Sequence, residues 1–286
     1  MSGEMLELVE CPRDAMQGWP RHIPAAEKVR YLSALLEVGF PVLDCGSFVS
    51  PKAIPQMADT AEVLDTLTSL SRRTRLLVIV ANTRGAEEAV QRNEVAYLGF
   101  PFSISETIQQ RNTNKSMAEA LTQVEEIHRL CEANSKELVV YVSMGFGNPY
   151  GDLYSPEIAA DWTGKLAAIG IRTIALADTV GVAKPDNIRQ LFSTLIPQYP
   201  EVTIGAHFHS TPDAWQEKLD AAWDAGCRRF DSAIGGIGGC PMAKDELVGN
   251  IGTEKLLYWA DGRGIQTGID RDAFSEATRL AGEIFV

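Results

Sequence analysis

The sequence predicts one α/β domain, a closed (β/α)8 TIM barrel, and two observations lead to that prediction. Short apolar runs rich in β-branched residues alternate with longer helical patterns along the whole 286-residue chain. Eight such runs occur, spaced by roughly thirty residues, which is about the length of one strand–helix unit. A barrel of eight parallel strands fits this number of units and this chain length. We therefore expect residues 1–286 to form a single catalytic domain with its active site at the C-terminal ends of the strands.

The eight expected strands share β-branched apolar residues and end near glycine, proline or polar residues. They are LELVEC (6–11), PVLDCGS (41–47), RLLVIVA (75–81), AYLGFPFS (96–103), ELVVYVS (137–143), TIALADT (173–179), VTIGAHFHS (202–210) and RRFDSAI (228–234).

Helix signals fill the segments between these strands. The segments 116–131, 155–170 and 211–226 each have a polar N-cap residue and apolar residues at helical spacing. The first begins with the capping-box pair Ser116 and Glu119. The other two place proline at the first helical position and glycine just past the end, so the third segment is expected to have Thr211 as its N-cap and Pro212 as its first helical residue.

An open, doubly wound sheet is the competing architecture. Such sheets commonly carry a phosphate-binding loop after the first strand. No G-x-G-x-x-G follows the first expected strand, and no G-x-x-x-x-G-K-[ST] occurs in the sequence. The barrel is therefore preferred.

The composition predicts a soluble, acidic, globular protein. Hydrophobic residues make up 45% of the chain and charged residues 22%, with a formal net charge of -12. This charge argues against nucleic acid or an anionic membrane as a partner, because surfaces that bind those are basic. The sequence starts without a secretory signal, has no uncharged apolar run of about 18 residues, and has five cysteines without a C-x-x-C pair. We expect a cytoplasmic protein with free thiols.

Polar residues occur at the ends of several expected strands, where the active site of a barrel is built. They are Arg13 and Asp14 after the first strand, Asp44 in the second, Asp178 and Thr179 at the end of the sixth, His207 and His209 in the seventh, and Cys240 and Asn250 in the stretch GGIGGCPMAKDELVGN after the eighth. These strand ends meet at one mouth, so we expect the side chains to converge there.

The histidine pair predicts a metal site when it is combined with its neighbours at the mouth. His207 and His209 point to the same face of a strand, because side chains alternate. Taken alone, the pair is more simply explained as two polar residues on a partly solvated strand, and Asp14 as a helix cap. Together with the amide of Asn250, they form a mixed oxygen and nitrogen donor set that suits Mg²⁺, Mn²⁺ or Zn²⁺.

Motifs spread over nearly the whole chain resemble those of one known family. ECPRDAMQ is similar to an opening E-x-G-P-R-D-x-x-Q, GSFVSPKAIPQMADTAEV to a second-strand loop, and YVSMGFGNPYGD to a fifth-strand segment. ADTVG and AHFHS resemble the sixth and seventh strands, and GIGGCPMA followed by GN resembles a signature loop with a catalytic cysteine and an asparagine ligand. The family is that of the 3-hydroxy-3-methylglutaryl-CoA lyases, within the metal-dependent TIM-barrel lyases and Claisen-type synthases.

The resemblance implies roles for particular residues. The implied metal ligands are Asp14, His207, His209 and Asn250, with Mg²⁺ or Mn²⁺ as the expected cofactor and Zn²⁺ as the alternative. The implied catalytic residues are Arg13 at the thioester oxygen, Cys240 in proton transfer, Asp178 as a supporting acid/base or an orienting carboxylate, and Asp44 where the family usually has a glutamate. The implied substrate contacts are Gln17, Ser143 and Thr179.

The chain also departs from the family's pattern. Cys11 replaces a glycine of the first motif, and Met144 and Asn148 stand where relatives often carry cysteines. The stretch PMAKDELVG between Cys240 and Asn250 is one residue longer than the usual version.

The resemblance implies a divalent-metal-dependent lyase that cleaves 3-hydroxy-3-methylglutaryl-CoA to acetyl-CoA and acetoacetate, as in leucine degradation and ketone body metabolism. The expected partner is the acyl-CoA substrate, and the expected assembly is a homodimer or another homo-oligomer. The alternatives are a lyase for a different 3-hydroxyacyl-CoA, an aldolase, or a condensing enzyme of the same superfamily. The condensing synthases usually carry further C-terminal regions, which favours the lyase. A non-catalytic barrel that binds acyl-CoA or metal is the remaining alternative.

Overall fold

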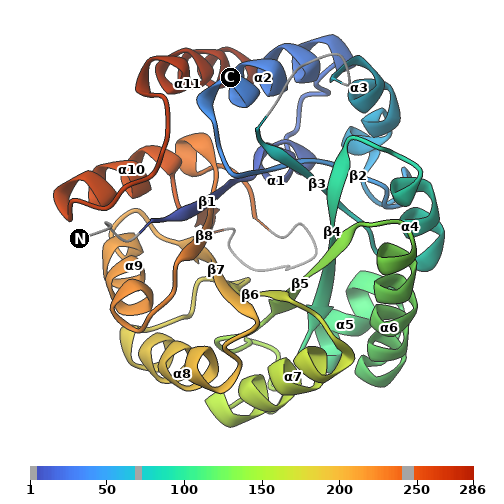
Figure 1. Ribbon diagram of the computed structural model, residues 1–286, viewed down its shortest axis with the longest axis vertical. Helices are drawn as coiled ribbons and strands as arrows, with labels where there is room; N and C mark the ends of the chain where they lie inside the picture. The colour runs from blue at the N-terminus through green and yellow to red at the C-terminus, as the bar shows by residue number, and fades with distance from the viewer. Residues whose placement is uncertain (1–4, 68–72, 240–247) are drawn as a thin grey trace.

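Eight parallel strands close into a barrel at the centre of the molecule (Figure 1). The computed structural model describes residues 5–67, 73–239 and 248–286. Each strand pairs with the next, and β8 pairs with β1, so the ring has no free edge. The strands are β1 (Glu7–Glu10), β2 (Val42–Ser47), β3 (Arg75–Ile79), β4 (Val95–Ser103), β5 (Glu137–Ser143), β6 (Thr173–Asp178), β7 (Thr203–Ser210) and β8 (Arg229–Ser232). The predicted TIM barrel is confirmed.

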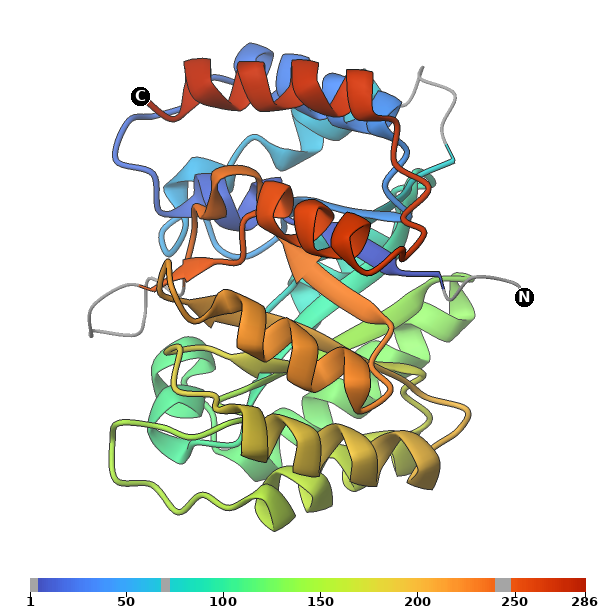
Figure 2. The same cartoon turned by 90° about the vertical axis from the view of Figure 1, so that its left-hand side faces the viewer.

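Helices form an outer ring around the strands, and the last of them packs against α2 (Figures 1 and 2). They are α1 (Pro12–Gln17), α2 (Ala25–Val38), α3 (Thr60–Leu67), α4 (Thr83–Val90), α5 (Glu106–Thr113), α6 (Met117–Ala133), α7 (Pro156–Ile169), α8 (Pro185–Gln198), α9 (Trp215–Asp224), α10 (Thr253–Gly262) and α11 (Arg271–Ile284), with the short 3-10 turns η1 (Pro55–Met57) and η2 (Ile234–Gly236). Within the described residues, no helix is both long enough and apolar enough to cross a membrane.

Two of the predicted helix starts are observed as expected. Ser116 caps α6 in a capping box with Glu119, and the Ser155 side chain accepts a hydrogen bond from the Ile158 amide at the start of α7. Gly170 ends α7 with φ of 111°, a left-handed conformation that glycine adopts without strain.

The third helix begins later than predicted. Thr211 and Pro212 form a turn in which the Ala214 amide donates to the Thr211 carbonyl at 3.4 Å, and α9 begins at Trp215. Proline is favoured at the second position of a turn as well as at the first position of a helix. The sequence pattern fits both arrangements, so it misplaced this helix start.

Two apolar layers lie on the two sides of the barrel strands. Val9 and Leu77 point into the barrel and belong to an inner cluster, whereas Leu8 and Leu76, one residue earlier in each strand, pack outward against the helices. This alternation gives every strand one inward face. On β7 that inward face carries His207.

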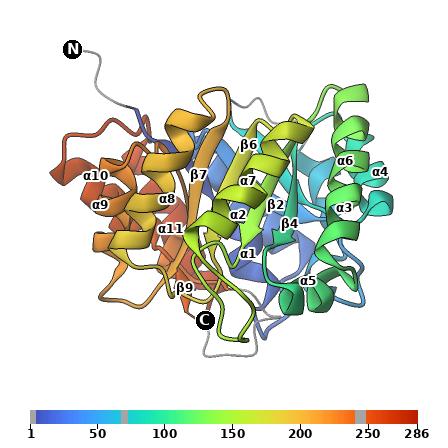
Figure 3. The same cartoon turned by 90° about the horizontal axis from the view of Figure 1, so that it is seen from below.

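The segments that follow the strands gather at one end of the barrel, where α1, α5 and a short strand, β9 (Gly249–Asn250), lie (Figure 3). β9 pairs antiparallel with β7 and places Asn250 opposite His209. The sequence did not predict this strand. It carries a residue from beyond β8 back to the end of β7.

Candidate active site

Strand register brings the two histidines of β7 beside residues of neighbouring strands. His207 pairs in register with Asp231 of β8, and His209 with Asn250 of β9. One atom from each of Asp14, His207 and His209 lies within 4.8 Å of the other two. The four predicted metal ligands therefore lie together at the mouth of the barrel.

Asp14 lies at the centre of this cluster. Its Oδ1 accepts hydrogen bonds from Arg13 Nη1 (3.0 Å) and Gln17 Nε2 (2.7 Å), and its Oδ2 accepts one from Asn250 Nδ2 (2.6 Å). Burial alone would raise the pKa of Asp14, but Arg13, the two histidines and Asn250 together lower it below its usual value. Asp14 is therefore an ionised carboxylate.

His209 presents a ring nitrogen that has no hydrogen-bond partner in the part of the chain that the structure describes. Its Nδ1 lies 2.9 Å from the Thr179 carbonyl oxygen, which can only accept, so Nδ1 carries the proton and Nε2 holds the lone pair. Among the described residues, nothing forms a hydrogen bond to this buried Nε2. Burial lowers the pKa of His209, and the neighbouring His207 lowers it further. A neutral imidazole with a buried, unpartnered lone pair fits a metal ligand.

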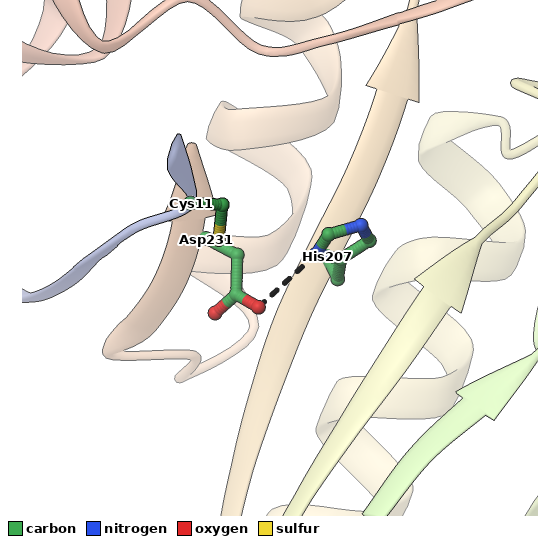
Figure 4. A group of neighbouring side chains, drawn as sticks. All are labelled: Cys11, His207 and Asp231. Carbon is green, nitrogen blue, oxygen red and sulfur yellow. Dashed lines mark hydrogen bonds and ion pairs between the residues drawn. The ribbon is translucent and has the colours of Figure 1, made fainter. Parts of the chain in front are cut away.

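His207 has a carboxylate partner inside the barrel. Its Nδ1 lies 3.0 Å from Asp231 Oδ2 (Figure 4), and Asp231 Oδ1 accepts a hydrogen bond from Arg229 Nη1 at 2.9 Å. Burial alone would lower the pKa of His207, but the hydrogen bond and charge of Asp231 raise it. Carboxylates that bind the second nitrogen of a metal-ligating histidine fix the orientation of its ring.

Cys11 lies beside the same pair (Figure 4). Its Sγ forms a second close group with one atom each from His207 and Asp231, all within 4.8 Å of one another. Burial raises the pKa of the Cys11 thiol well above its usual range, and both oxygens of Asp231 are already bonded. Cys11 is therefore a neutral side chain packed in the inner apolar cluster.

A glycine permits the close packing around Asn250. A Cβ atom at Gly238 would lie 2.5 Å from Asn250 Nδ2 and 2.8 Å from Asp14 Oδ2, and the φ of Gly238 is 110°. Asn250 Nδ2 also donates to the Ile237 carbonyl at 2.9 Å. Both donations come from the amide nitrogen, which leaves the amide oxygen available to a cation. Carboxylate oxygen, imidazole nitrogen and amide oxygen together fit Mg²⁺, Mn²⁺ or Zn²⁺.

Arg13 and Asp44 form a buried ion pair beside the cluster. Arg13 Nε donates to both carboxylate oxygens, at 3.0 and 3.2 Å, and Nη2 donates to Oδ2 at 2.5 Å. Burial raises the pKa of Asp44 to about 6 against the opposing charge of Arg13. Burial would lower the pKa of Arg13, but the charges of Asp44 and Asp14 outweigh it and raise that pKa. Arg13 is therefore a permanent cation at the mouth.

A cavity of about 170 Å³ opens in front of these residues. Its polar side is formed by Arg13, Asp14, His207, His209 and the three predicted substrate contacts, Gln17, Ser143 and Thr179. Most of the remaining wall is apolar and includes Val49, Ile54, Ile79, Pro101 and Ala177, and Asn112 and Tyr141 also line the cavity. A mainly apolar cleft with a few convergent polar groups is typical of a small-molecule site.

Asp178 is not part of the cavity lining. Its side chain has no exposure, its Oδ2 lies 2.6 Å from Lys218 Nζ, and its Oδ1 accepts a hydrogen bond from the Ala183 amide at 3.1 Å. Of the two roles implied for Asp178, this geometry supports orientation rather than proton exchange with a substrate. The other predicted catalytic residue, Cys240, lies outside the described residues.

Sequence reasoning missed Asp231, Arg229, Lys218 and Gly238. Arg229 and Asp231 did carry a signal, because two charged residues at alternate positions of a buried strand must share one face. Lys218 carried none, since a lysine in an amphipathic helix is normally solvated. The role of Gly238 depends on the approach of Asn250, which the sequence does not display.

A closed parallel barrel whose mouth holds a carboxylate, two imidazoles, an amide and a guanidinium defines a TIM-barrel enzyme with a candidate site for a divalent cation. Comparison with known proteins narrows this class. The HMGL-like family model matches residues 8–281, and the chain belongs to that family.

Relatives resemble the chain over most of its length. Mitochondrial hydroxymethylglutaryl-CoA lyase of Bos taurus is 34% identical, over 96% of this chain and 84% of its own. (R)-citramalyl-CoA lyase of Chloroflexus aurantiacus is 33% identical, over 93% of this chain and 86% of its own. An HMG-CoA lyase of Acinetobacter baumannii, solved with coenzyme A and 3-methylmalate, matches with a TM-score of 0.91 and 31% identity, over 100% of this chain and 92% of its own. The predicted family and enzyme class, a carbon–carbon lyase, are confirmed.

Proposed function

We propose that the protein cleaves 3-hydroxy-3-methylglutaryl-CoA to acetyl-CoA and acetoacetate, with Mg²⁺ or Mn²⁺ as its cofactor. One observation carries this proposal: beside the ionised Asp14, the Nε2 of His209 has no hydrogen-bond partner within residues 5–67, 73–239 and 248–286. The Arg13 guanidinium adjoins the same cavity. Several relatives are named as lyases of this acyl-CoA.

The reaction breaks the bond between C2 and C3 of the acyl chain. The C3 hydroxyl loses its proton and becomes the ketone of acetoacetate, while the bonding electrons pass to C2 and form the enolate of the thioester. Protonation of C2 then gives acetyl-CoA. The site must therefore remove one proton from an oxygen, hold the charge of the enolate, and deliver one proton to carbon.

A divalent cation held by Asp14, His207, His209 and Asn250 would act as a Lewis acid toward the C3 hydroxyl. The protein's own part is to present these ligands in fixed orientations. Asp231 holds the Nδ1 of His207, and the Thr179 carbonyl holds the Nδ1 of His209, which leaves each Nε2 for the cluster.

Arg13 can stabilise the enolate. A guanidinium has five N–H donors, and three of them are used in the bonds to Asp14 and Asp44. The other two can point to the thioester oxygen, and one well-placed donor of this kind contributes roughly 3–4 kcal/mol to catalysis. Asp44 sets the plane of the guanidinium through its paired contacts. We assign the proton delivered to C2 to Cys240, as the family resemblance implies.

(R)-citramalyl-CoA is the second candidate substrate, because the lyase named for it is as similar to this chain as the hydroxymethylglutaryl-CoA lyases are. Its carboxylate is attached directly to C3, one carbon closer than in 3-hydroxy-3-methylglutaryl-CoA. The same bond cleavage would release pyruvate in place of acetoacetate. Both substrates carry a methyl group on C3, and the cavity offers apolar side chains such as Ile54 and Ile79 for such a group.

A product assay separates the two candidates. Purified protein is incubated with Mg²⁺ and one acyl-CoA at a time, and acetoacetate, pyruvate and acetyl-CoA are measured by mass spectrometry. We expect kcat/KM to be larger for 3-hydroxy-3-methylglutaryl-CoA, and Asp14→Asn to abolish the product. If kcat/KM is larger for citramalyl-CoA, then citramalyl-CoA is the preferred substrate and 3-hydroxy-3-methylglutaryl-CoA is not. Product from neither would refute both substrates.

The proposal includes a homo-oligomeric assembly and a cytoplasmic location. Light scattering coupled to size-exclusion chromatography gives the number of chains in the particle, and a single chain per particle would contradict the first part. Fractionation of the source cells tests the second.

A further inference from the structure

A lysine is buried directly behind the candidate metal site. Lys218 lies on α9 and is 1% exposed. Its ammonium group has three acceptors: Asp178 Oδ2 at 2.6 Å, the His209 carbonyl at 2.8 Å and the Gly181 carbonyl at 3.1 Å. All three protons of the ammonium are thus used. A buried charge of this kind persists only when it is paired and fully hydrogen-bonded.

The contacts of Lys218 join the end of β7 to the turn that follows β6. Asp178 ends β6, and its second oxygen accepts the Ala183 amide, so residues 178–183 are held from both sides. Lys218 also donates to the main-chain carbonyl of His209, at the end of β7. The lysine therefore sets the distance between this turn and the strand that carries both histidines.

Thr179, within this turn, is the residue that contacts the His209 ring. Its carbonyl accepts the Nδ1 proton of His209, and its Oγ1 accepts the Met144 amide at 3.0 Å. The Thr179 carbonyl is thereby fixed relative to β5, β6 and β7. With Nδ1 protonated, the lone pair of His209 can only be on Nε2, which is buried and has no hydrogen-bond partner among the described residues, and His209 groups with Asp14 and His207 as possible metal ligands.

We propose that Lys218 and Asp178 are positioning residues that hold the Thr179 carbonyl against His209 and so fix the metal-binding tautomer of that histidine. Neither side chain lines the cavity. The identity of the ligand as a divalent cation rests on the proposed function, whereas the tautomer of His209 is a property of the protein without metal.

The chain offers a matched control for a substitution at Lys218. Lys28 on α2 is also buried, 2% exposed, and its ammonium group contacts the Gln56 carbonyl and Asp59 Oδ1. Among the described residues, none of its hydrogen bonds reaches His207 or His209. Replacing either lysine by methionine keeps a side chain of similar length and removes one buried charge.

The test compares Lys218→Met with Lys28→Met in two measurements. Nitrogen-15 NMR of the imidazoles in metal-free protein reports the tautomer, and the four histidines of the chain can be assigned one by one. Calorimetry with Mn²⁺ reports the affinity. For Lys218→Met we expect His209 to populate both tautomers and the Mn²⁺ affinity to fall 10–100-fold, the usual effect of losing an outer-shell partner. Lys28→Met should leave the tautomer unchanged and the affinity within about twofold.

A folded Lys218→Met protein with a single His209 tautomer and parental Mn²⁺ affinity would overturn the proposal. If that variant does not fold, Lys218→Met with Asp178→Asn removes both charges together, and the same two results are expected of it. A parent protein that binds no Mn²⁺ would contradict the proposed function alone, because the tautomer measurement still decides the positioning role.

Discussion

The two histidines of β7 share one strand face but differ in what holds them. The Nδ1 of His207 bonds to the carboxylate of Asp231, which is itself paired with Arg229, whereas the Nδ1 of His209 bonds to the main-chain carbonyl of Thr179. Burial lowers the pKa of both rings, and only the carboxylate beside His207 reverses that effect. A neutral carbonyl orients an imidazole, while a carboxylate also makes it more basic. The same motif therefore yields one neutral ligand, His209, and one more basic ligand, His207, for which a metal ion must compete with a proton.

The largest expected effect comes from removing either ring. If both histidines are ligands, His207→Ala and His209→Ala should each lower the Mn²⁺ affinity more than about 100-fold, because loss of an outer-shell partner alone costs 10–100-fold. Lyase activity should fall with it. Calorimetry and the product assay measure the two effects, with the exposed His22→Ala as control. Full Mn²⁺ binding in either variant would show that this histidine is not a ligand.

The sequence predicted both rings but not the contacts that hold them, since Asp231 was missed and Thr179 was predicted only as a substrate contact. Alternation along one strand is a local rule, so the spacing of His207 and His209 is enough to place them on the same face. Asp231 and Thr179 lie 24 and 30 residues away from the rings they contact. Those contacts depend on the register between neighbouring strands, which single-strand patterns do not specify.

The same limit applies to the rest of the fold. All eight barrel strands followed from apolar runs, because each run carries its own β-branched composition. β9 did not, since two residues are too few to show a pattern, and it forms only by pairing with β7. The late start of α9 at Trp215 has a similar cause, because a proline fits a turn as well as a helix start.

A smaller effect is expected when Asp231 is replaced by asparagine. Asp231→Asn removes the charge that raises the pKa of His207 but keeps an oxygen for its Nδ1 proton. At pH 8 we expect Mn²⁺ affinity to fall 10–100-fold. In the parent, Mn²⁺ binding should be lost as pH falls through the raised pKa of His207, and in the variant this loss should move to lower pH.

Calorimetric titrations with Mn²⁺ between pH 5 and pH 8 would measure both changes. If Asp231→Asn leaves the affinity and its pH dependence unaltered, then Asp231 serves only as the charge partner of Arg229. The distinction between the two histidines would in that case be one of geometry and not of basicity.

The last prediction concerns folding stability and not metal affinity, at a buried carboxyl group that lacks the cation that Asp231 has. Glu10 has no exposure, and it accepts hydrogen bonds from the Ile234 amide at 2.8 Å and the Thr253 hydroxyl at 2.5 Å. No ion pair involves Glu10 within the described part of the chain. Burial raises its pKa from the usual 4.5 to about 8, although both hydrogen bonds oppose this shift.

This raised pKa makes folding stability depend on pH. Between pH 4.5 and about 8 the folded protein holds a proton on Glu10 that the unfolded chain releases, so stability is fully present below this window and falls as pH rises through it. The slope approaches about 1.4 kcal/mol per pH unit, which amounts to roughly 3 kcal/mol between pH 5 and pH 8. Glu10→Gln keeps an oxygen for the Ile234 amide and cannot ionise. Urea unfolding at several pH values should show a flatter profile in Glu10→Gln, and parallel profiles would mean that Glu10 is ionised in the folded barrel.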